Sequence, residues 1–312
     1  MKDDFNVSVV IPVYNAQEYL TIAIKSLDSI NEVNEIILVD DGSTDSSLLL
    51  CEKFSAENDK IKVLQHHDKK NKGAAASRNL GISHAKSEFI SFLDADDYYL
   101  PHRFENDKKL FRLYEDAEGV YGCSQEKFES EKSAELFFTT RDTVITAMTE
   151  FIAPENLFKS LIFGGHGEFH TSTITLKKTV FYKAGFFNEK IRYVEDTELW
   201  LKLSLKCRLY CGNISEPQSI RLVHENNSIH QFEKIAPFRS LMYQELFSWC
   251  IKESFPFQIK NDLFNALHQY SYGENYSVKM LFFEQLKKNM RLIFTSFFIK
   301  KTHQLFFTIL KA

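Results

Sequence analysis

The chain has 312 residues, of which 44% are hydrophobic and 26% charged, as in an ordinary globular protein. This length fits two domains, or one large α/β domain with an extension. A net charge of −4 argues against a nucleic-acid-binding protein. Five cysteines without a Cys-x-x-Cys pair argue against a disulfide framework or a zinc ribbon, and they indicate a reducing, cytoplasmic compartment. We see no apolar signal region, and no apolar run reaches the ~18 residues that span a bilayer.

The first hundred residues alternate between short apolar runs and segments with helical spacing. We expect strands at Val7–Tyr14, Glu35–Asp40, Ile61–Gln65 and Phe89–Leu93, and helices at Ala16–Ile30, Thr44–Asn58, Gly73–Ala85 and Pro101–Glu115. This alternation predicts an α/β fold with a mostly parallel central sheet flanked by helices. In such sheets ligands bind beyond the carboxyl ends of the strands.

The second half of the chain is more mixed. Glu126–Arg141 is polar and irregular, so we expect a loop there. Thr171–Leu176 and Ser219–Val223 have the composition of strands, and Glu195–Cys207 has the spacing of an amphipathic helix. From about residue 233 the sequence predicts only helices.

Polar motifs follow three of the expected strands, at Pro12–Asn15, Asp40–Asp45 and Asp94–Asp97. These strand ends should meet at one edge of the sheet, so their carboxylates would gather there. Clustered carboxylates are costly unless a cation neutralises them, and Mg²⁺ or Mn²⁺ prefers such oxygen ligands. Each motif alone is also typical of a turn or a helix cap.

The two common phosphate-binding loops, Gly-x-Gly-x-x-Gly and the P-loop, are both missing from the sequence. A diphosphate would therefore be held by the metal and by cationic side chains. Arg78, which follows the small residues of Gly73–Ser77, is the candidate cation. An ion pair at the surface is the alternative interpretation of Arg78.

The order of these motifs resembles family 2 glycosyltransferases, an inverting family with the A-type nucleotide-sugar-binding fold. The resemblance covers roughly residues 5–230. The matching segments are Val7–Asn15, Val39–Asp45, Lys72–Gly81, Phe92–Asp97, Ala184–Leu203 and Arg221–Ser228. Each motif alone is unspecific, whereas their combination is highly specific.

The resemblance implies a binding site for a nucleotide-sugar donor, with UDP as the favoured nucleotide. Pro12, Tyr14 and Asn15 would line the nucleotide base, and Glu18 would belong to the same pocket. Asp41 would read the uracil ring.

Further implied roles concern the metal and the sugar. Asp94 and Ala95 would lie near the ribose and the sugar, whereas Asp96 would bind the Mn²⁺ or Mg²⁺ ion directly. Asp97 is a weaker candidate for the same shell. His224 would complete the metal shell or contact the diphosphate, although a lone histidine is more often structural.

The acceptor side of the family's site corresponds to Ala184–Leu203. Asp196 occupies the position of the catalytic base, which would take the proton of the acceptor hydroxyl. Glu195 would sit beside it, although both acids would also suit the start of a helix. The family usually has Phe-Asp-Glu where this chain has Asn188 as the middle residue, a change that a turn tolerates.

A glycine-rich loop contains Gly165 and His166, and it is a candidate for the acceptor or donor-sugar pocket. A plain surface loop is the alternative interpretation.

We therefore expect a catalytic domain over residues 1–232, with a nucleotide-binding half (1–100) and an acceptor-side half (101–232), and a helical region over 233–312. Residues 278–312 carry seven basic side chains and one acid among Phe-rich stretches. This pattern fits peripheral contact with the inner face of a membrane, and equally helical packing against the catalytic domain or against another subunit.

The predicted function is transfer of a sugar to a glycan or a lipid-linked acceptor in the synthesis of bacterial cell-surface polysaccharide. Two alternatives stay open. A nucleotidyltransferase would need a basic, glycine-rich loop soon after the first strand, where this chain has Asn15–Glu18. A non-catalytic nucleotide-sugar-binding protein would be expected to lack the acids Asp94, Asp96 and Asp196, which are all present.

Overall fold

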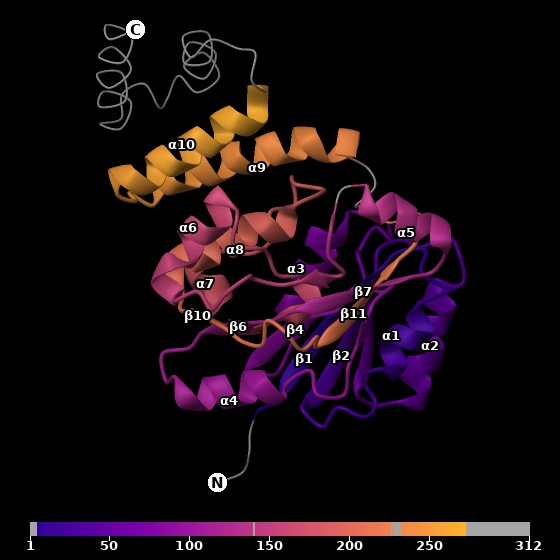
Figure 1. Cartoon of the computed structure of the whole chain (residues 1–312). Helices are drawn as coiled ribbons and strands as arrows, with labels where there is room; N and C mark the ends of the chain where they lie inside the picture. The colour runs from indigo at the N-terminus through magenta and orange to yellow at the C-terminus, as the bar shows by residue number, and fades with distance from the viewer. Residues whose placement is uncertain (1–4, 140, 226, 228–231, 273–312) are drawn as a thin grey trace, which may run out of the picture. The chain divides into compact units, whose positions relative to one another are not determined.

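The computed structural model describes residues 5–139, 141–225, 227 and 232–272 of the chain (Figure 1). By its internal contacts the chain divides into two units, Met1–Phe232 and Glu233–Ala312.

A seven-stranded sheet forms the centre of the first unit, in the order β10-β6-β9-β4-β1-β2-β3. β1 pairs in parallel with β2 and β4, and β9 is antiparallel to both of its neighbours. The strands are β1 (Val7–Val13), β2 (Val33–Asp40), β3 (Ile61–Gln65), β4 (Phe89–Phe92), β6 (Gly119–Tyr121), β9 (Ile174–Lys177) and β10 (Leu209–Cys211). The predicted mostly parallel sheet is confirmed.

Helices cover both faces of this sheet because its strands are apolar on both sides. On one face of the sheet, Val9 belongs to a hydrophobic core that includes residues of α1 and α2, and Phe104 next to α4. On the other face, Val10 belongs to a core that includes residues of α3, α7 and α8. In Figure 1, α4 lies across the sheet from α6, α7 and α8. The helices are α1 (Leu20–Lys25), α2 (Ser47–Glu57), α3 (Ala74–His84), α4 (Glu105–Leu113), α6 (Leu157–Phe163), α7 (Val180–Ala184) and α8 (Glu195–Lys206).

Close packing fixes α3 on the sheet. Gly81 lies directly over Val10 of β1, where an added Cβ would clash with the valine side chain. Glycine at this point therefore lets the helix axis approach the strand.

The prediction of a loop over Glu126–Arg141 is wrong. Ser124–Phe128 forms β7, which lies between β11 (Ser219–Val223) and β8 (Ile145–Thr146) in a second sheet completed by β5 (Tyr98–Tyr99). Glu131–Phe138 forms α5, which begins with a capping box made by Ser130 and Ser133. The polar composition reflects half-exposed elements rather than irregular backbone.

The expected strand Thr171–Leu176 begins instead with a 3₁₀ turn, η2 (Thr171–Thr173). A second 3₁₀ turn, η1 (Pro154–Asn156), precedes α6. Arg103 holds η2 in place: it is fully buried and donates from Nε to the Ser172 carbonyl at 2.9 Å. Arg103 also pairs with the buried Asp107 at 2.7 Å, so its charge is balanced.

The second unit is helical where it is described. It contains α9 (Phe232–Lys252), with Pro237 inside the helix, and α10 (Phe257–Tyr272). Among the helices that the structure describes, none has the length and apolarity to cross a membrane. The basic, Phe-rich stretch 278–312 lies outside the described residues, so its contact with a membrane or with another subunit stays a prediction.

Candidate active site

Asp94–Asp97 form a tight turn directly after β4, in which the Asp97 amide donates to the Asp94 carbonyl at 3.0 Å. The turn sends its carboxylates in different directions. Asp96 Oδ2 lies 3.1 Å from His224 Nε2 and 3.2 Å from Asn227 Nδ2. His224 follows β11, so the second sheet brings this histidine to the carboxyl end of β4. The sequence-predicted pair Asp96 and His224 therefore meets in the structure.

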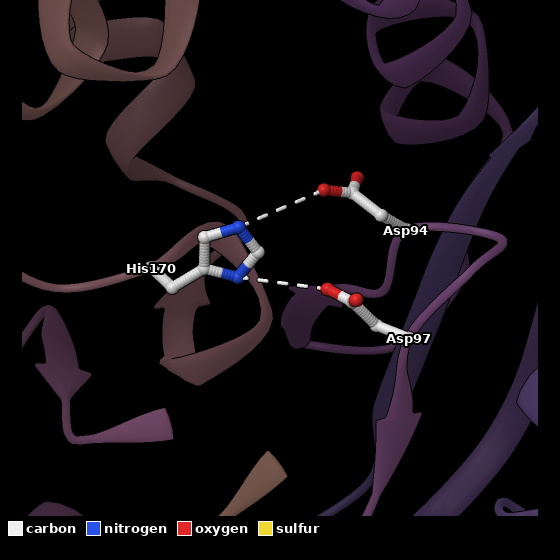
Figure 2. Close-up of side chains that lie close together, drawn as sticks. All are labelled: Asp94, Asp97 and His170. Carbon is white, nitrogen blue, oxygen red and sulfur yellow. Dashed lines mark ion pairs between the residues drawn. The ribbon is translucent and has the colours of Figure 1, made fainter. Parts of the chain in front are cut away.

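His170 brings a second group of ligand atoms together with Asp94 and Asp97 (Figure 2). Its Nε2 lies 3.9 Å from Asp94 Oδ2 and its Nδ1 lies 3.8 Å from Asp97 Oδ2. Figure 2 shows the ring with each nitrogen turned toward one carboxylate. The three ligand atoms lie within 4.8 Å of one another.

The electrostatics of this group favour neutral Asp97 and neutral His170. Burial, with the charges of Asp96 and Asp94, raises the pKa of Asp97 well above its usual range. Burial, with the nearby Arg221, lowers the pKa of His170 to about 4. Asp94 differs: burial raises its pKa, but Arg78, together with His170 and Arg221, more than offsets this effect, so the pKa of Asp94 is lowered. The cluster thus carries more acidic groups than the protein's own cations neutralise.

These residues fit a hard divalent cation. Three carboxylates and two imidazoles, on Asp94, Asp96, Asp97, His170 and His224, offer the ligand atoms that such ions accept. Among the described residues, the buried atoms Oδ2 of Asp97 and Nδ1 of His224 have no hydrogen-bond partner. A bound cation would relieve the crowding of the carboxylates. The choice between Mn²⁺ and Mg²⁺ stays a prediction.

Arg78 lies on α3 and joins the strand-end acids to α8. Its Nη2 donates to Asp94 at 2.7 Å and its Nη1 donates to Glu195 at 2.6 Å. The side chain is buried, so the alternative of an ion pair at the surface is wrong. Its expected contact with a diphosphate stays a prediction.

Asp196 lies in the first turn of α8, one residue after Glu195. Its Oδ2 accepts a hydrogen bond from Thr171 Oγ1 at 3.1 Å, and its Oδ1 accepts from the Thr197 amide at 2.7 Å. The helix starts in a strained way, because Val194 adopts the left-handed conformation with φ 59°. For a β-branched residue this conformation persists only when the surroundings enforce it. The candidate base therefore lies in a turn that other contacts must hold in place.

Asp41 lies at the end of β2 and organises the loop that leads into α3. Its two oxygens accept hydrogen bonds from the Lys72 amide at 2.7 Å and from the Gly73 amide at 2.8 Å. His66 Nε2 lies 3.3 Å from Asp41 Oδ1 and 3.1 Å from Ser77 Oγ. Asp41 is thus buried and fixed at the carboxyl edge, and its contact with a uracil ring stays a prediction.

The other residues expected around the nucleotide base lie on and after β1. Pro12 is the sixth residue of that strand, and Tyr14 is half exposed just beyond it. Asn15 adopts a left-handed conformation with φ 49°, and its Oδ1 accepts from the Thr44 amide at 2.8 Å. Glu18 lies exposed on the same loop. The ends of β1 and β2 are therefore joined, as the strand-end argument predicts.

The glycine-rich loop is held by a different set of contacts. His166 pairs with Glu150 at 2.9 Å, and the His166 carbonyl accepts from the Thr149 amide at 2.8 Å. Gly165 has φ 82°, a conformation that favours glycine. Among the described residues no recorded contact joins this loop to Asp96 or Asp196, so its role in a pocket stays a prediction.

Three further residues belong to this site and escape the sequence argument. His66 is a polar residue directly after β3, so its position at a strand end is a signal that the sequence does carry. His170 precedes η2 with no motif around it. Tyr19 stacks on the His224 ring, with centroids 4.8 Å apart and planes at 10°, and donates from Oη to Glu129 at 3.0 Å. The positions of His170 and Tyr19 in the site depend on long-range packing, which no local sequence signal reports.

A comparison with known families defines the class of protein. Residues 8–158 match the family described as Glycosyl transferase family 2, a region that includes β1 to β4, Asp41, Arg78 and the acidic turn. Residues 8–158 of the chain therefore form a domain of glycosyltransferase family 2.

Particular relatives come from bacteria. The chain is 32% identical over 197 residues to an uncharacterized glycosyltransferase of Rickettsia typhi. The aligned region covers 63% of this chain and 58% of the relative. It is also 32% identical over 217 residues to the minor teichoic acid biosynthesis protein GgaA of Bacillus subtilis, with coverages of 67% and 45%. The chain thus spans less than two thirds of the length of either relative.

Among solved structures, the chain is similar to S. aureus TarS 1–349, with a TM-score of 0.61 and 20% sequence identity. The likeness covers 89% of this chain and 77% of the TarS chain. TarS 1–349 has also been solved in complex with UDP-GlcNAc. At this level of identity the likeness shows the fold, and it agrees with the fold class expected from the sequence.

Proposed function

We propose that the chain transfers a sugar from a nucleotide-diphosphate donor, with UDP as the nucleotide, to a hydroxyl group of an acceptor. One observation carries this proposal. Arg78 contacts both Asp94 in the acidic turn and Glu195 at the start of α8, so the strand-end carboxylates and the candidate base Asp196 share one site. Family membership and the UDP-GlcNAc complex of TarS support the same conclusion.

Asp196 would act as general base toward the acceptor. A hydroxyl group is a weak nucleophile near neutral pH, and a carboxylate within hydrogen-bond reach takes its proton as the bond to the anomeric carbon forms. Attack from the side opposite the diphosphate inverts that carbon. Thr171 and the Thr197 amide orient the Asp196 carboxylate for this role.

The donor would lie along the carboxyl edge of the sheet. Asp41, Asn15, Tyr14, Pro12 and Glu18 would surround the base, and the carboxylates of the acidic turn with His224 or His170 would hold a divalent cation. When bound, such an ion supplies positive charge that stabilises the leaving diphosphate.

The acceptor is proposed to be a glycan or a lipid-linked glycan of the bacterial cell surface, reached from the cytoplasmic side of the membrane. The name of the B. subtilis relative, a teichoic acid biosynthesis protein, supports a cell-surface product.

A thermal-shift panel tests the donor proposal. The full chain would be heated with UDP, UDP-GlcNAc, UDP-glucose and GDP-mannose, each with and without Mn²⁺, because a ligand raises Tm by binding the folded state. We expect UDP compounds with Mn²⁺ to raise Tm in the wild type. UTP with glucose 1-phosphate is included, since stabilisation by that pair alone would instead favour a nucleotidyltransferase.

A further inference from the structure

Arg78 is the only arginine in the described part of the chain whose two terminal nitrogens are paired with carboxylates from both sides of the proposed site. Its partners Asp94 and Glu195 lie 16 and 117 residues away along the chain. Arg78 is 4% exposed, and its guanidinium carbon lies 5.4 Å from the centre of the Phe187 ring. At this depth the two charge-assisted bonds are stronger than exposed ones.

The helix that carries Arg78 is a fixed support. Ser77 Oγ bonds His66 at 3.1 Å, and Asn79 bonds both the amide and the carbonyl of Phe187, at 3.0 and 2.9 Å. Gly81 is packed closely on β1. A support of this kind transmits a displacement of Asp94 to Glu195 instead of absorbing it.

The start of α8 needs such a support. Val194 sits at the helix N-cap with φ 59°, which costs a non-glycine residue about 1–3 kcal/mol and requires contacts that enforce it. The Val194 side chain makes no cap hydrogen bond. The bond from Arg78 to Glu195, the next residue, is therefore a contact that holds this turn in place.

We propose that Arg78 is a positioning residue that couples occupation of the donor site to the order of the first turn of α8, and hence to the position of Asp196. When a donor engages Asp94, the Asp94–Arg78–Glu195 chain of bonds tightens and fixes the turn that carries the base. This inference rests on the proposed function, since it requires a nucleotide at the acidic turn. It assigns Arg78 and Glu195 to positioning and leaves proton transfer to Asp196.

Amide hydrogen exchange of the full chain, with and without UDP and Mn²⁺, tests the coupling. Binding should slow exchange over residues 12–15 and 91–97, which lie at the donor site. It should also slow exchange over residues 192–198 by at least about fivefold, the lower end of typical coupling between two sites. In Glu195→Ala, which removes the acceptor of the Arg78 bond, and in Arg78→Lys, residues 12–15 and 91–97 should still respond, whereas residues 192–198 should change by less than about twofold.

Asp196→Asn is the matched control, because it removes one carboxylate charge from the same helical turn and leaves both bonds of Arg78 in place. It should keep the slowing over residues 192–198. Unchanged exchange over β1 and β2 without ligand checks that each variant folds.

Each outcome decides between possibilities. No response at residues 12–15 and 91–97 in the wild type removes the proposed donor site itself. A response there without one at residues 192–198 overturns the coupling alone, whether or not the variants fold. Equal slowing over residues 192–198 in Glu195→Ala and the wild type also overturns it, because the donor would then shield this turn directly.

Discussion

Glu195 should make the free energy of unfolding fall as pH rises, because its surroundings disfavour the ionised carboxylate. Arg78 is shared by Glu195 and Asp94, with Asp196 close by, so one guanidinium serves several acids. Burial and the charge of Asp196 therefore outweigh Arg78 and raise the pKa of Glu195 from 4.5 to about 7.

The sign of the effect follows from proton uptake. Between pH 4.5 and 7 the folded chain keeps a proton on Glu195 that the unfolded chain releases, so the free energy of unfolding falls as pH rises through this window. Each unit of pKa shift corresponds to about 1.4 kcal/mol, so ionised Glu195 lowers the free energy of unfolding by on the order of 3 kcal/mol. This full loss of stability is reached above pH 7. Below pH 4.5 the cost vanishes.

Urea unfolding at pH 5 and pH 8 measures this cost. Glu195→Gln removes the titrating group, so the wild type should lose about 2–3 kcal/mol more than the variant between the two pH values. Glu189→Gln, at an exposed carboxylate that also bonds α3 through Asn79, is the control and should follow the wild type. Parallel pH dependence in the wild type and Glu195→Gln would refute the reasoning.

Three further outcomes are expected. Asp196→Asn should lower turnover by about 10²–10⁴ while UDP affinity, followed by titration calorimetry, stays at the wild-type value; wild-type turnover would eliminate Asp196 as base. Asp96→Ala should abolish metal-dependent turnover and the extra stabilisation that Mn²⁺ gives UDP in thermal shift, and retention of both would remove Asp96 from the metal site. Gly81→Ala should cost about 1–3 kcal/mol in urea unfolding because its Cβ meets Val10, and the same substitution should cost less when it is made in a Val10→Ala background. If Gly81→Ala unfolds like the wild type, α3 does not pack this closely.

The carboxyl edge of the sheet was predictable because local signals and topology agree there. Buried apolar strands followed by acids, as at Asp41 and Asp94–Asp97, fix both the sheet and the place of the site. The meeting of Asp96 with His224 followed from the family's motif order, since nothing local to either residue indicates the 128 residues that separate them.

Other features depend on packing that sequence periodicity does not report. The half-exposed β7 and α5 lack a continuous apolar face, so Glu126–Arg141 resembled a loop. His170 joins Asp94 and Asp97 through packing, next to η2, which the buried Arg103 links to Ser91 of β4. Arg78 was identified as a cation of the site, whereas its bond to Glu195 joins segments that only the folded chain brings together.

The most direct test of the central claim is release of UDP from the UDP-sugar selected by the thermal-shift panel, measured with Mn²⁺ and with isolated bacterial cell-envelope glycans as acceptors. The proposed function predicts release that depends on the acceptor, forms a glycoside of inverted anomeric configuration by NMR, and falls by about 10²–10⁴ in Asp196→Asn. Acceptor-independent release, or equal release by the wild type and Asp196→Asn, would contradict it.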